Sequence, residues 1–311
     1  MTAVLDASSR WLPARLGEVE ELLRKTVAGH GEVLGADATA TLAAGGKRLR
    51  PMLVLLCAGP EGDAATVRAA TAIELVHMAT LVHDDVLDDA PLRRGLPTVA
   101  ATSGRERATA TGDLLLSRAF ALLGDAGDAR AVALLADASV ALARGELAQR
   151  HDAFDLGLDV DRYLSRCRLK TGRLFECACL LGRDDEALRE FGAEIGLAFQ
   201  LLDDVLDVAG PPERTGKARG TDLLDGTVTL PLIEAAAADP GIREADLHAL
   251  DDASAEILCD RIARSGALER VRARALEMVA AAKRALERAR FEPEQRQLLS
   301  LVADGVVQRY S

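Results

Sequence analysis

Aromatic residues are scarce in this chain: Phe, Tyr and Trp together make up only 3% of its 311 residues. Sustained alternation of apolar and polar residues, which marks a half-buried strand, is missing as well. Aliphatic and small residues dominate instead, and such a composition favours helices over a sheet sandwich. Glycine and proline fall at breaks between long segments, without a domain-sized linker, tandem repeat or low-complexity tract. We therefore expect a single all-helical domain over residues 1–311.

The chain also lacks an excess of basic charge. It carries 38 Lys and Arg against 49 Asp and Glu, which gives a formal net charge of −11. An acidic surface argues against nucleic acid as the main partner. Cationic side chains that bind a ligand must therefore be concentrated locally, so their positions in the sequence are informative.

Zinc-binding and membrane-spanning patterns are missing too. The five cysteines show no CxxC or His-rich spacing and lie mostly within apolar helical patterns, as buried reduced thiols do. No apolar run reaches the ~20 residues that span a bilayer. The N-terminus lacks the basic-then-apolar layout of a secretory signal. We expect a soluble, cytoplasmic protein without a transmembrane segment.

What the chain does contain is two short acidic clusters of identical spacing. They are Asp84, Asp85 and Asp88 in HDDVLDDAPLRRG, and Asp203, Asp204 and Asp207 in FQLLDDVLDVAG. On a helix, the first and last Asp of each cluster stack on one face, one turn apart, where they repel. A hard divalent cation relieves this repulsion, and Mg²⁺ suits carboxylates combined with phosphate oxygens. One such cluster is typical of a solvated helix face, whereas two favour a metal-bridged diphosphate.

Apolar periodicity predicts long helices and places both clusters at helix ends. The expected helices run over about Ala7–Ala28, Asp63–Asp88, Arg105–Leu123, Asp128–His151, Val160–Leu181 and Asp184–Val208. Expected loops cover Ala90–Gly104 and Gly210 to about Gly226. A helix C-terminus carries negative partial charge, so an acidic cluster there is unfavourable unless a cation compensates it.

Cationic residues surround the first cluster in the sequence. Arg93 and Arg94 follow Asp88 in an Arg-Arg-Gly turn, which suits phosphate oxygens left uncovered by metal, although such a turn alone is typical of surface charge. Lys47 and Arg50 follow two glycines where a helix could begin. Spacing favours equally an anion site at the helix N-terminus and a merely solvated helix start.

Six blocks of the sequence resemble, in order, the signature blocks of the trans-polyprenyl diphosphate synthases. They are GGKRLRP, ELVHMATLVHDDVLDDAPLRRGLPT, GDLLLSRAF, KTGRLFECACLLG, FQLLDDVLDVAG and GKARGTDLLDGTVTLPL. The resemblance implies an all-α isoprenoid-synthase fold, a single helical bundle around a deep central cavity, normally as a homodimer. It also implies a magnesium-dependent prenyltransferase. Its substrates would be isopentenyl diphosphate and an allylic prenyl diphosphate, and its product a longer all-trans polyprenyl diphosphate.

The same resemblance implies a role for individual residues. Asp84, Asp88, Asp203 and Asp207 would hold Mg²⁺, three ions per active site, for which Mn²⁺ could substitute. Arg93, Lys170 and Lys217 would contact the allylic diphosphate, and Lys47, Arg50, His77 and Arg94 would contact isopentenyl diphosphate. Thr171, Phe199 and Gln200 would lie near the reacting carbons. Asp85 and Asp204 would orient their neighbours rather than bind metal.

The implied reaction agrees with the residue chemistry. Metals and cations stabilise the departing diphosphate and leave an allylic carbocation in a dry pocket. The double bond of isopentenyl diphosphate, held close by its own diphosphate, attacks that cation. The proton then goes to the released diphosphate, because no side chain is an obvious general base. An aliphatic wall protects the cation from water.

Product length depends on the residues that precede the first cluster. Ala79 and Thr80 lie five and four residues before Asp84, so they are expected one turn along the same helix face. Short-chain relatives carry an aromatic residue there. These small residues should leave the pocket open down to Leu116 and Phe120, and we expect a product longer than farnesyl diphosphate.

Two positions depart from the commonest family pattern. Thr227 replaces a lysine that would contact the allylic diphosphate, and Leu96 replaces a lysine often found after the Arg-Arg-Gly turn. We expect the first change to weaken allylic-substrate binding or to alter a closure step. Nothing in the sequence explains the second.

Two other functions remain open from the sequence. A terpene cyclase uses similar Asp clusters, but it does not need isopentenyl-site residues such as Lys47 and His77, and it commonly steers cations with aromatic faces. A subunit of a two-component synthase could dispense with metal ligands, yet both clusters are intact. We also expect a peripheral membrane contact for the lipidic product.

Overall fold

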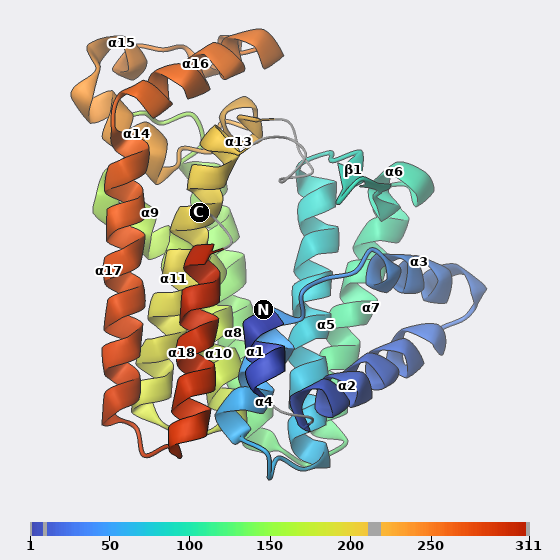
Figure 1. The fold of residues 1–311 in the computed structure, drawn as a ribbon. Coiled ribbons are helices and arrows are strands. Elements are labelled where there is room, and N and C mark those ends of the chain that lie inside the picture. Colours follow the sequence, from blue (N-terminus) through green and yellow to red (C-terminus); the bar gives the residue numbers. More distant parts are fainter. Residues whose placement is uncertain (1, 9–10, 211–218, 309–311) are drawn as a thin grey trace. The chain divides into compact units, whose positions relative to one another are not determined.

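The computed structural model describes residues 2–8, 11–210 and 219–308. Most of them are helical, which confirms the predicted all-α class (Figure 1). The helices are α1 (Thr2–Ala7), α2 (Trp11–Ala28), α3 (Glu32–Ala43), α4 (Leu49–Ala58), α5 (Ala64–Leu87), α6 (Val99–Ser103), α7 (Arg105–Gly124), α8 (Ala129–His151), α9 (Val160–Cys167), α10 (Arg173–Gly182), α11 (Glu186–Ala209), α13 (Thr221–Leu224), α14 (Leu230–Ala238), α15 (Pro240–Arg243), α16 (Asp252–Arg264), α17 (Ala267–Arg288) and α18 (Pro293–Gln308). Two short strands, β1 (Leu92–Arg93) and β2 (Leu96–Pro97), a π-helical turn η1 (Arg168–Gly172) and a 3-10 turn η2 (Leu247–Ala249) complete the order.

These elements form two compact units that interleave along the chain. The first comprises Met1–Ser139, Leu174–Arg189 and Ala289–Val302, and the second comprises Val140–Arg173, Glu190–Arg288 and Ala303–Ser311. The first acidic cluster belongs to the first unit and the second cluster to the second unit. A single domain over residues 1–311 stays a prediction.

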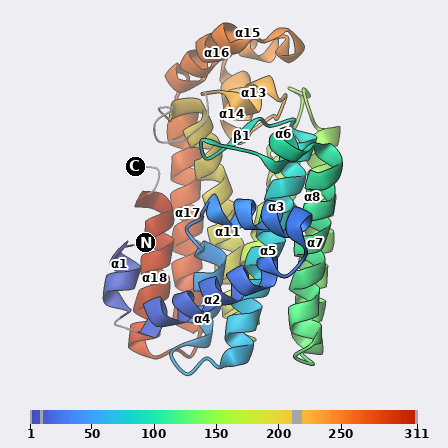
Figure 2. The same cartoon turned by 90° about the vertical axis from the view of Figure 1, so that its right-hand side faces the viewer.

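Helix α5 is the central helix of the first unit and packs against α2, α4 and α7 (Figures 1 and 2). Asp63 caps its first turn by accepting hydrogen bonds from the N–H groups of Ala65 and Thr66. By length and composition α5 could cross a membrane, but 67% of its most apolar window is buried inside the protein. Such burial is expected of the core helix of a globular protein. The predicted helix over Asp63–Asp88 is confirmed to within one residue at each end.

A glycine lets α7 approach α5 closely beside the first acidic cluster. A Cβ atom on Gly112 would come within 2.2 Å of the His83 ring, so a larger residue would displace the imidazole. His83 Nε2 lies 3.4 Å from the carbonyl oxygen of Thr109 and 3.4 Å from a carboxylate oxygen of Asp113. This packing fixes the end of α5 that carries the aspartates.

A tight hairpin follows α5 where the sequence predicted a plain loop. Strands β1 and β2 pair antiparallel, with Arg93 opposite Leu96. The two residues between them, Arg94 and Gly95, both have positive φ (54° and 77°), as a two-residue hairpin turn requires. Thr98 closes the base, because its hydroxyl donates to the Ala90 carbonyl and it caps α6. The turn and the closing hydrogen bond thus fix the positions of Arg93 and Arg94 in the hairpin.

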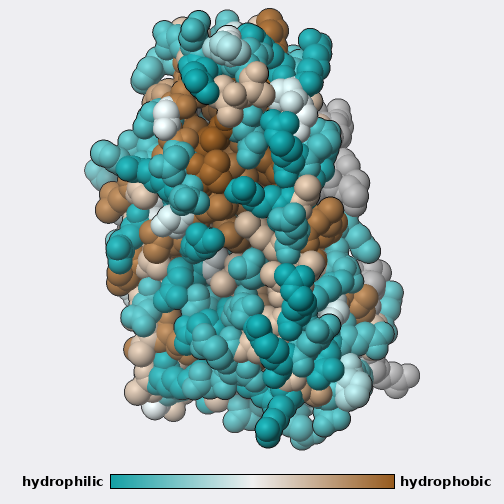
Figure 3. Space-filling view, turned by 90° about the vertical axis from the view of Figure 1, so that its left-hand side faces the viewer, coloured by the Kyte–Doolittle hydropathy of each residue, from teal (hydrophilic) through white to brown (hydrophobic). Residues whose placement is uncertain are grey.

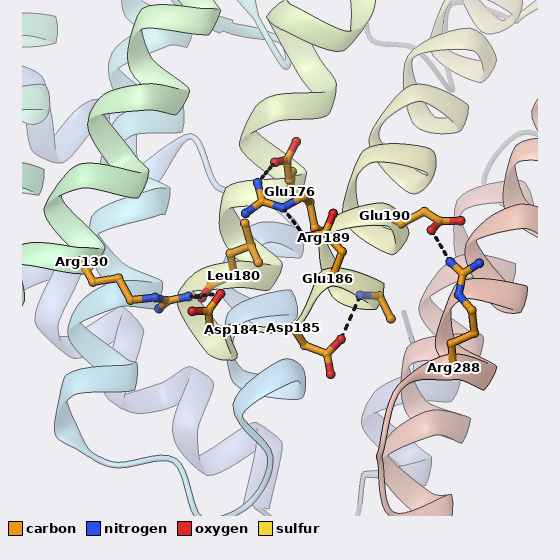
Figure 4. A network of polar contacts seen from close by, with 10 residues as sticks. Arg130, Glu176, Leu180, Asp184, Asp185, Glu186, Arg189, Glu190 and Arg288 are labelled. Atoms are coloured by element: carbon orange, nitrogen blue, oxygen red, sulfur yellow. Dashed lines mark hydrogen bonds and ion pairs between the residues drawn. The ribbon is translucent and has the colours of Figure 1, made fainter.

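The turn between α10 and α11 is held by charged side chains of the first unit (Figure 4). Arg130 donates to the Leu180 carbonyl at 2.9 Å and pairs with Asp184 at 3.2 Å. Arg189 pairs with the buried Glu176 at 2.6 Å, which ties the first turn of α11 back to α10. These contacts set where α11 begins.

The second unit contains α9, η1, most of α11, and α14 to α17. Helix α14 packs against both α17 and α9. The face along which α17 lies carries apolar side chains in its upper half (Figure 3). A shallow depression lined by α9, α11 and α17, with Leu164, Glu194 and Met278 among its residues, contains none of the predicted site residues.

Three local features differ from the expected helices. The helix expected over Ala7–Ala28 begins at Trp11 as α2, and Ala7 is the last residue of the separate helix α1. The predicted loop over Ala90–Gly104 contains β1, β2 and α6. The predicted helix over Val160–Leu181 is interrupted by the π-helical turn η1. The apolar pattern could not predict η1. One extra residue in a helical turn leaves the apolar residues on either side at nearly the same helical spacing.

We predict that Gly182→Ala destabilises the protein. A Cβ atom there would lie 2.3 Å from the Val54 carbonyl oxygen and 2.7 Å from the Cys57 Cβ, so backbone rather than a flexible side chain would have to move. Such overpacking should lower the free energy of unfolding by about 1–3 kcal/mol, measured by urea denaturation. Gly17→Ala is the control, since nothing lies within 4 Å of that position. Equal stability of Gly182→Ala and wild type would contradict the prediction.

Candidate active site

The first acidic cluster closes the C-terminal end of α5. Asp88 is the C-cap residue, and its N–H donates to the Asp84 carbonyl at 2.9 Å, which places the two residues one turn apart. Asp88 is exposed and Asp84 half-buried, whereas Asp85 is buried. Arg93 reaches back from the hairpin and contacts Asp85 Oδ1 through both Nε and Nη2 at 2.7 Å. Arg93 thus neutralises the buried member of the cluster.

A loop before α4 gathers cationic side chains beside α5. Arg48 has left-handed φ (47°) and pairs with Glu20 at 2.5 Å and with Glu74 of α5 at 2.9 Å. A Cβ atom on Gly46 would lie 2.7 Å from Arg48 Nη1 and 3.3 Å from Arg94 Nη1. The hairpin arginine and the loop arginine therefore meet beside Gly46.

Burial shapes the charges of this cationic group. Burial lowers the pKa of Arg50 to about 10, with Glu74 opposing the change, and its buried Nε has no hydrogen-bond partner among the described residues. The Arg50 guanidinium lies 4.7 Å from the centre of the Phe175 ring. Burial, and then Arg50 and Arg94, hold the pKa of His77 well below its usual range. His77 is therefore neutral at physiological pH and can donate a hydrogen bond to an anion.

The structure brings together three residues of the predicted isopentenyl site, Arg50, His77 and Arg94. Lys47 lies exposed in the same loop. The sequence interpretation missed Arg48 and Glu74, which hold this group together. Burial raises the pKa of Glu74, although Arg48 and Arg50 oppose the rise. The signal was available, because Glu74 is a carboxylate inside an otherwise apolar stretch of α5.

The second acidic cluster lies near the C-terminal end of α11. Asp203 is exposed, Asp207 is half-buried and Asp204 is buried. Asp204 accepts hydrogen bonds from the Tyr163 hydroxyl at 2.5 Å and from Gln200 Nε2 at 2.8 Å. Burial raises the pKa of Asp204 to about 7, and nearby Asp222 adds to the rise. Both clusters therefore have a buried middle aspartate with internal donors and more exposed first and last aspartates.

Two predicted site residues, Lys170 and Thr171, lie on the π-helical turn η1. Such turns often occur at functional sites because they redirect one or two side chains. Lys170 Nζ pairs with Glu146 of α8 at 2.5 Å, and a Cβ atom on Gly145 would lie 2.5 Å from the Lys170 backbone nitrogen. Burial raises the pKa of Glu146, but Lys170 and Arg150 lower it by more, so the pKa lies below its usual value. Thr171 is buried and donates to Gln200 Oε1 at 2.6 Å.

The remaining predicted residues are placed as follows. Phe199 is half-buried on α11, and Lys217 lies outside the described residues. Ala79 is buried on α5, whereas Thr80, Leu116 and Phe120 are half-buried. Thr227 is half-buried, and its N–H donates to the Asp222 carbonyl at 2.8 Å. Leu96 is exposed in β2.

The carboxylates suit a hard cation, although the described residues contain no preassembled group of three acidic, histidine or cysteine ligands. Asp84 and Asp88 in the first unit, and Asp203 and Asp207 in the second, offer oxygen donors at the more exposed positions of each cluster. Mg²⁺ commonly takes one or two carboxylates and completes its shell with water and substrate phosphates. The donor set therefore fits Mg²⁺ bound together with a diphosphate.

Known proteins are similar to this chain in sequence and in fold. The family model described as Polyprenyl synthetase matches residues 32–258. Heptaprenyl diphosphate synthase component 2 from Geobacillus stearothermophilus is 39% identical over 241 residues, covering 74% of this chain and 75% of that protein. Geranylfarnesyl diphosphate synthase from Natronomonas pharaonis is 34% identical over 302 residues, covering 86% of this chain and 87% of that protein.

A solved structure extends the likeness to nearly the whole chain. The polyprenyl synthase from Caulobacter crescentus, complexed with calcium and isoprenyl diphosphate, has 34% sequence identity and a TM-score of 0.89, covering 98% of each chain. The predicted isoprenoid-synthase fold is thereby confirmed. With a family model that matches well over half of its length, this chain belongs to the polyprenyl synthetase family of chain-elongating prenyltransferases.

Proposed function

We propose that this protein is a magnesium-dependent polyprenyl diphosphate synthase whose product is longer than farnesyl diphosphate. It condenses isopentenyl diphosphate with an allylic prenyl diphosphate.

The observation that carries this proposal is the group of Arg50, His77 and Arg94 in the same unit as the first acidic cluster. A cationic group of this kind would bind a second diphosphate without metal, which chain elongation requires and terpene cyclisation does not.

Four aspartates would hold the metal ions. Asp84 and Asp88 from one cluster and Asp203 and Asp207 from the other are the proposed ligands, with three Mg²⁺ per active site and Mn²⁺ as a substitute. When bound, the ions neutralise the charge that develops on the departing diphosphate. Asp85, already paired with Arg93, steadies the end of α5 instead.

Protein side chains perform the rest of the reaction. Arg50 and Arg94 hold isopentenyl diphosphate by charge, and neutral His77 donates a hydrogen bond to it. Lys170, on η1, and Arg93 hold the allylic diphosphate. Thr171, Gln200 and Phe199 lie near the allylic cation and stabilise it by oxygen lone pairs and a ring face. The proton lost after carbon–carbon bond formation goes to the released diphosphate.

Exposed apolar side chains support proposals on assembly and location. Val140 and Leu147 of α8 are 59% and 71% exposed at a seven-residue spacing, which suits helix packing between two copies in a homodimer. Leu87, Leu92 and Leu96 are also exposed and would serve a transient membrane contact during product release. We propose a cytoplasmic protein that meets the membrane only peripherally.

A second candidate follows from one of the relatives. The Geobacillus protein is component 2 of a heptaprenyl diphosphate synthase, so this chain could require a different subunit for activity. Both acidic clusters and the cationic group lie in this chain, which favours an enzyme complete in one kind of subunit.

We predict that the purified protein alone converts isopentenyl diphosphate and an allylic primer into polyprenyl diphosphates. Light scattering should show that it is a dimer.

Chelation should abolish turnover, and Asp88→Ala should lower kcat by about 10²-fold or more, because a metal ligand supports several kcal/mol of charge stabilisation. A cyclic hydrocarbon formed from the allylic substrate alone would contradict the proposal. Activity only after a second protein is added would favour the two-component alternative.

We predict that Thr80→Phe shortens the products. Thr80 lies one turn before Asp84 and is half-buried. Ala79, the position at which the sequence predicted that a Phe would shorten the products, is instead packed at 1% exposure. A phenyl ring at position 80 should therefore fill the space into which the chain grows, while Ala79→Phe should mainly overpack the core. Chromatography of the products measures the change. Thr80→Val is the matched control, and an unchanged distribution in Thr80→Phe would refute this pocket.

We predict that Thr227→Lys lowers the KM for the allylic substrate severalfold, since it restores a cation near the diphosphate. The backbone at this position is already held by Asp222, so the substitution alters charge more than conformation. Thr227→Met, which adds length without charge, is the control. Steady-state kinetics with each substrate measure the effect. Equal KM values in the Lys and Met variants would show that the missing charge is unimportant.

A further inference from the structure

Tyr163 of α9 is a fully buried aromatic residue that the proposed function leaves without a role. Its hydroxyl donates to Asp204 Oδ2 at 2.5 Å, across 41 residues of sequence. The ring also contacts the guanidinium of Arg166, 5.3 Å from the ring centre. A polar hydroxyl buried at this depth needs a partner, and Asp204 supplies it.

The hydrogen bond from Tyr163 is the first of three in a row. The other oxygen of Asp204, Oδ1, accepts from Gln200 Nε2 at 2.8 Å. Gln200 Oε1 in turn accepts from the Thr171 hydroxyl at 2.6 Å. Tyr163, Asp204, Gln200 and Thr171, named here the Tyr163 relay, all belong to the second unit.

The direction of each hydrogen bond in the relay is set by its neighbour. The amide nitrogen of Gln200 faces Asp204 Oδ1, and its amide oxygen faces the Thr171 hydroxyl. Thr171 has one hydroxyl hydrogen, which it donates in the hydrogen bond to Gln200 Oε1. The remaining lone pairs of Thr171 are then directed away from Gln200. Without an anchored Asp204, the amide could turn over and reverse the hydroxyl.

We propose that Tyr163 is a positioning residue for chain elongation, acting through the Tyr163 relay. By anchoring Asp204 it holds Gln200 in one amide orientation, and Gln200 makes Thr171 present lone pairs rather than its hydrogen to the allylic cation. Lone pairs stabilise a cation, whereas a hydroxyl hydrogen repels it. This inference rests on the proposed function, since it requires a cationic reaction centre beside Thr171.

The test is Tyr163→Phe, which removes one hydroxyl and keeps the ring that packs on Arg166. We expect kcat to fall about tenfold, the effect of losing one hydrogen bond in the transition state. KM values for both substrates should stay within about twofold, because the ground state does not use the dipole. Thr26→Val is the matched control: it also removes a buried hydroxyl, which donates to Leu22 of its own helix, far along the chain from the relay.

A double-mutant cycle separates positioning from mere structural support. In a Thr171→Val background, Tyr163→Phe should lower kcat by less than about twofold, since the relay then has no hydroxyl to orient. A second tenfold loss in that background would overturn the proposal. So would a fall in kcat matched by weaker binding of a non-reactive thio-analogue of the allylic diphosphate, measured by calorimetry.

A second variant keeps the inference testable if Tyr163→Phe fails to fold. Asp204→Leu is similar in size and removes both acceptor oxygens, so it breaks the relay without emptying the site. It should lower kcat and lose that effect when Thr171 is already Val. Full additivity would refute the relay. If the wild-type protein makes no elongated product, the proposed function itself fails, whereas a normal wild type with additive variants refutes only the role of Tyr163.

Discussion

A buried aspartate at the centre of each acidic cluster is the constraint on which the rest of the site depends. Burying a carboxylate is costly unless donors satisfy it, and the two clusters solve this differently. Asp85 takes the charged Arg93 from the hairpin, and Asp204 takes the neutral Tyr163 and Gln200. In both cases the buried residue fixes the helix end, so the flanking aspartates are left in more exposed positions suited to a cation.

Close backbone approaches place the functional groups. Gly46 makes room for two arginines, Gly112 receives the His83 ring, and Gly145 lies against the backbone of Lys170. A side chain at Gly145 would displace the backbone of Lys170, and one at Gly112 would displace the His83 ring next to the first acidic cluster. The scarcity of bulky aromatic residues noted in the sequence fits this packing, because small and aliphatic side chains let helices and loops approach each other.

The charge around Glu74 is opposite in sign to the net charge of the protein. The protein is acidic overall, with a net charge of −11, yet several arginines meet around one buried glutamate, Glu74. That glutamate limits their mutual repulsion, and His77 stays neutral among them. This cationic group on an otherwise negative protein favours a small anion over an extended polyanion such as nucleic acid.

The sequence by itself determined the local features. The period of apolar residues located α5 within one residue at each end, and the spacing of the aspartates placed Asp84 and Asp88 one turn apart. Each depends on residues a few positions apart, whose geometry follows from the backbone alone. The hairpin after α5 was expected only as a loop that contains the Arg-Arg-Gly turn. Only the tertiary structure decided the remaining features. Tyr163 contacts Asp204 and Glu74 contacts Arg48 because helices bring residues that are far apart in the sequence together. The burial of Ala79 and the π-helical turn η1 likewise follow from how the helices pack, or from one extra residue in a turn, and no local pattern reports them.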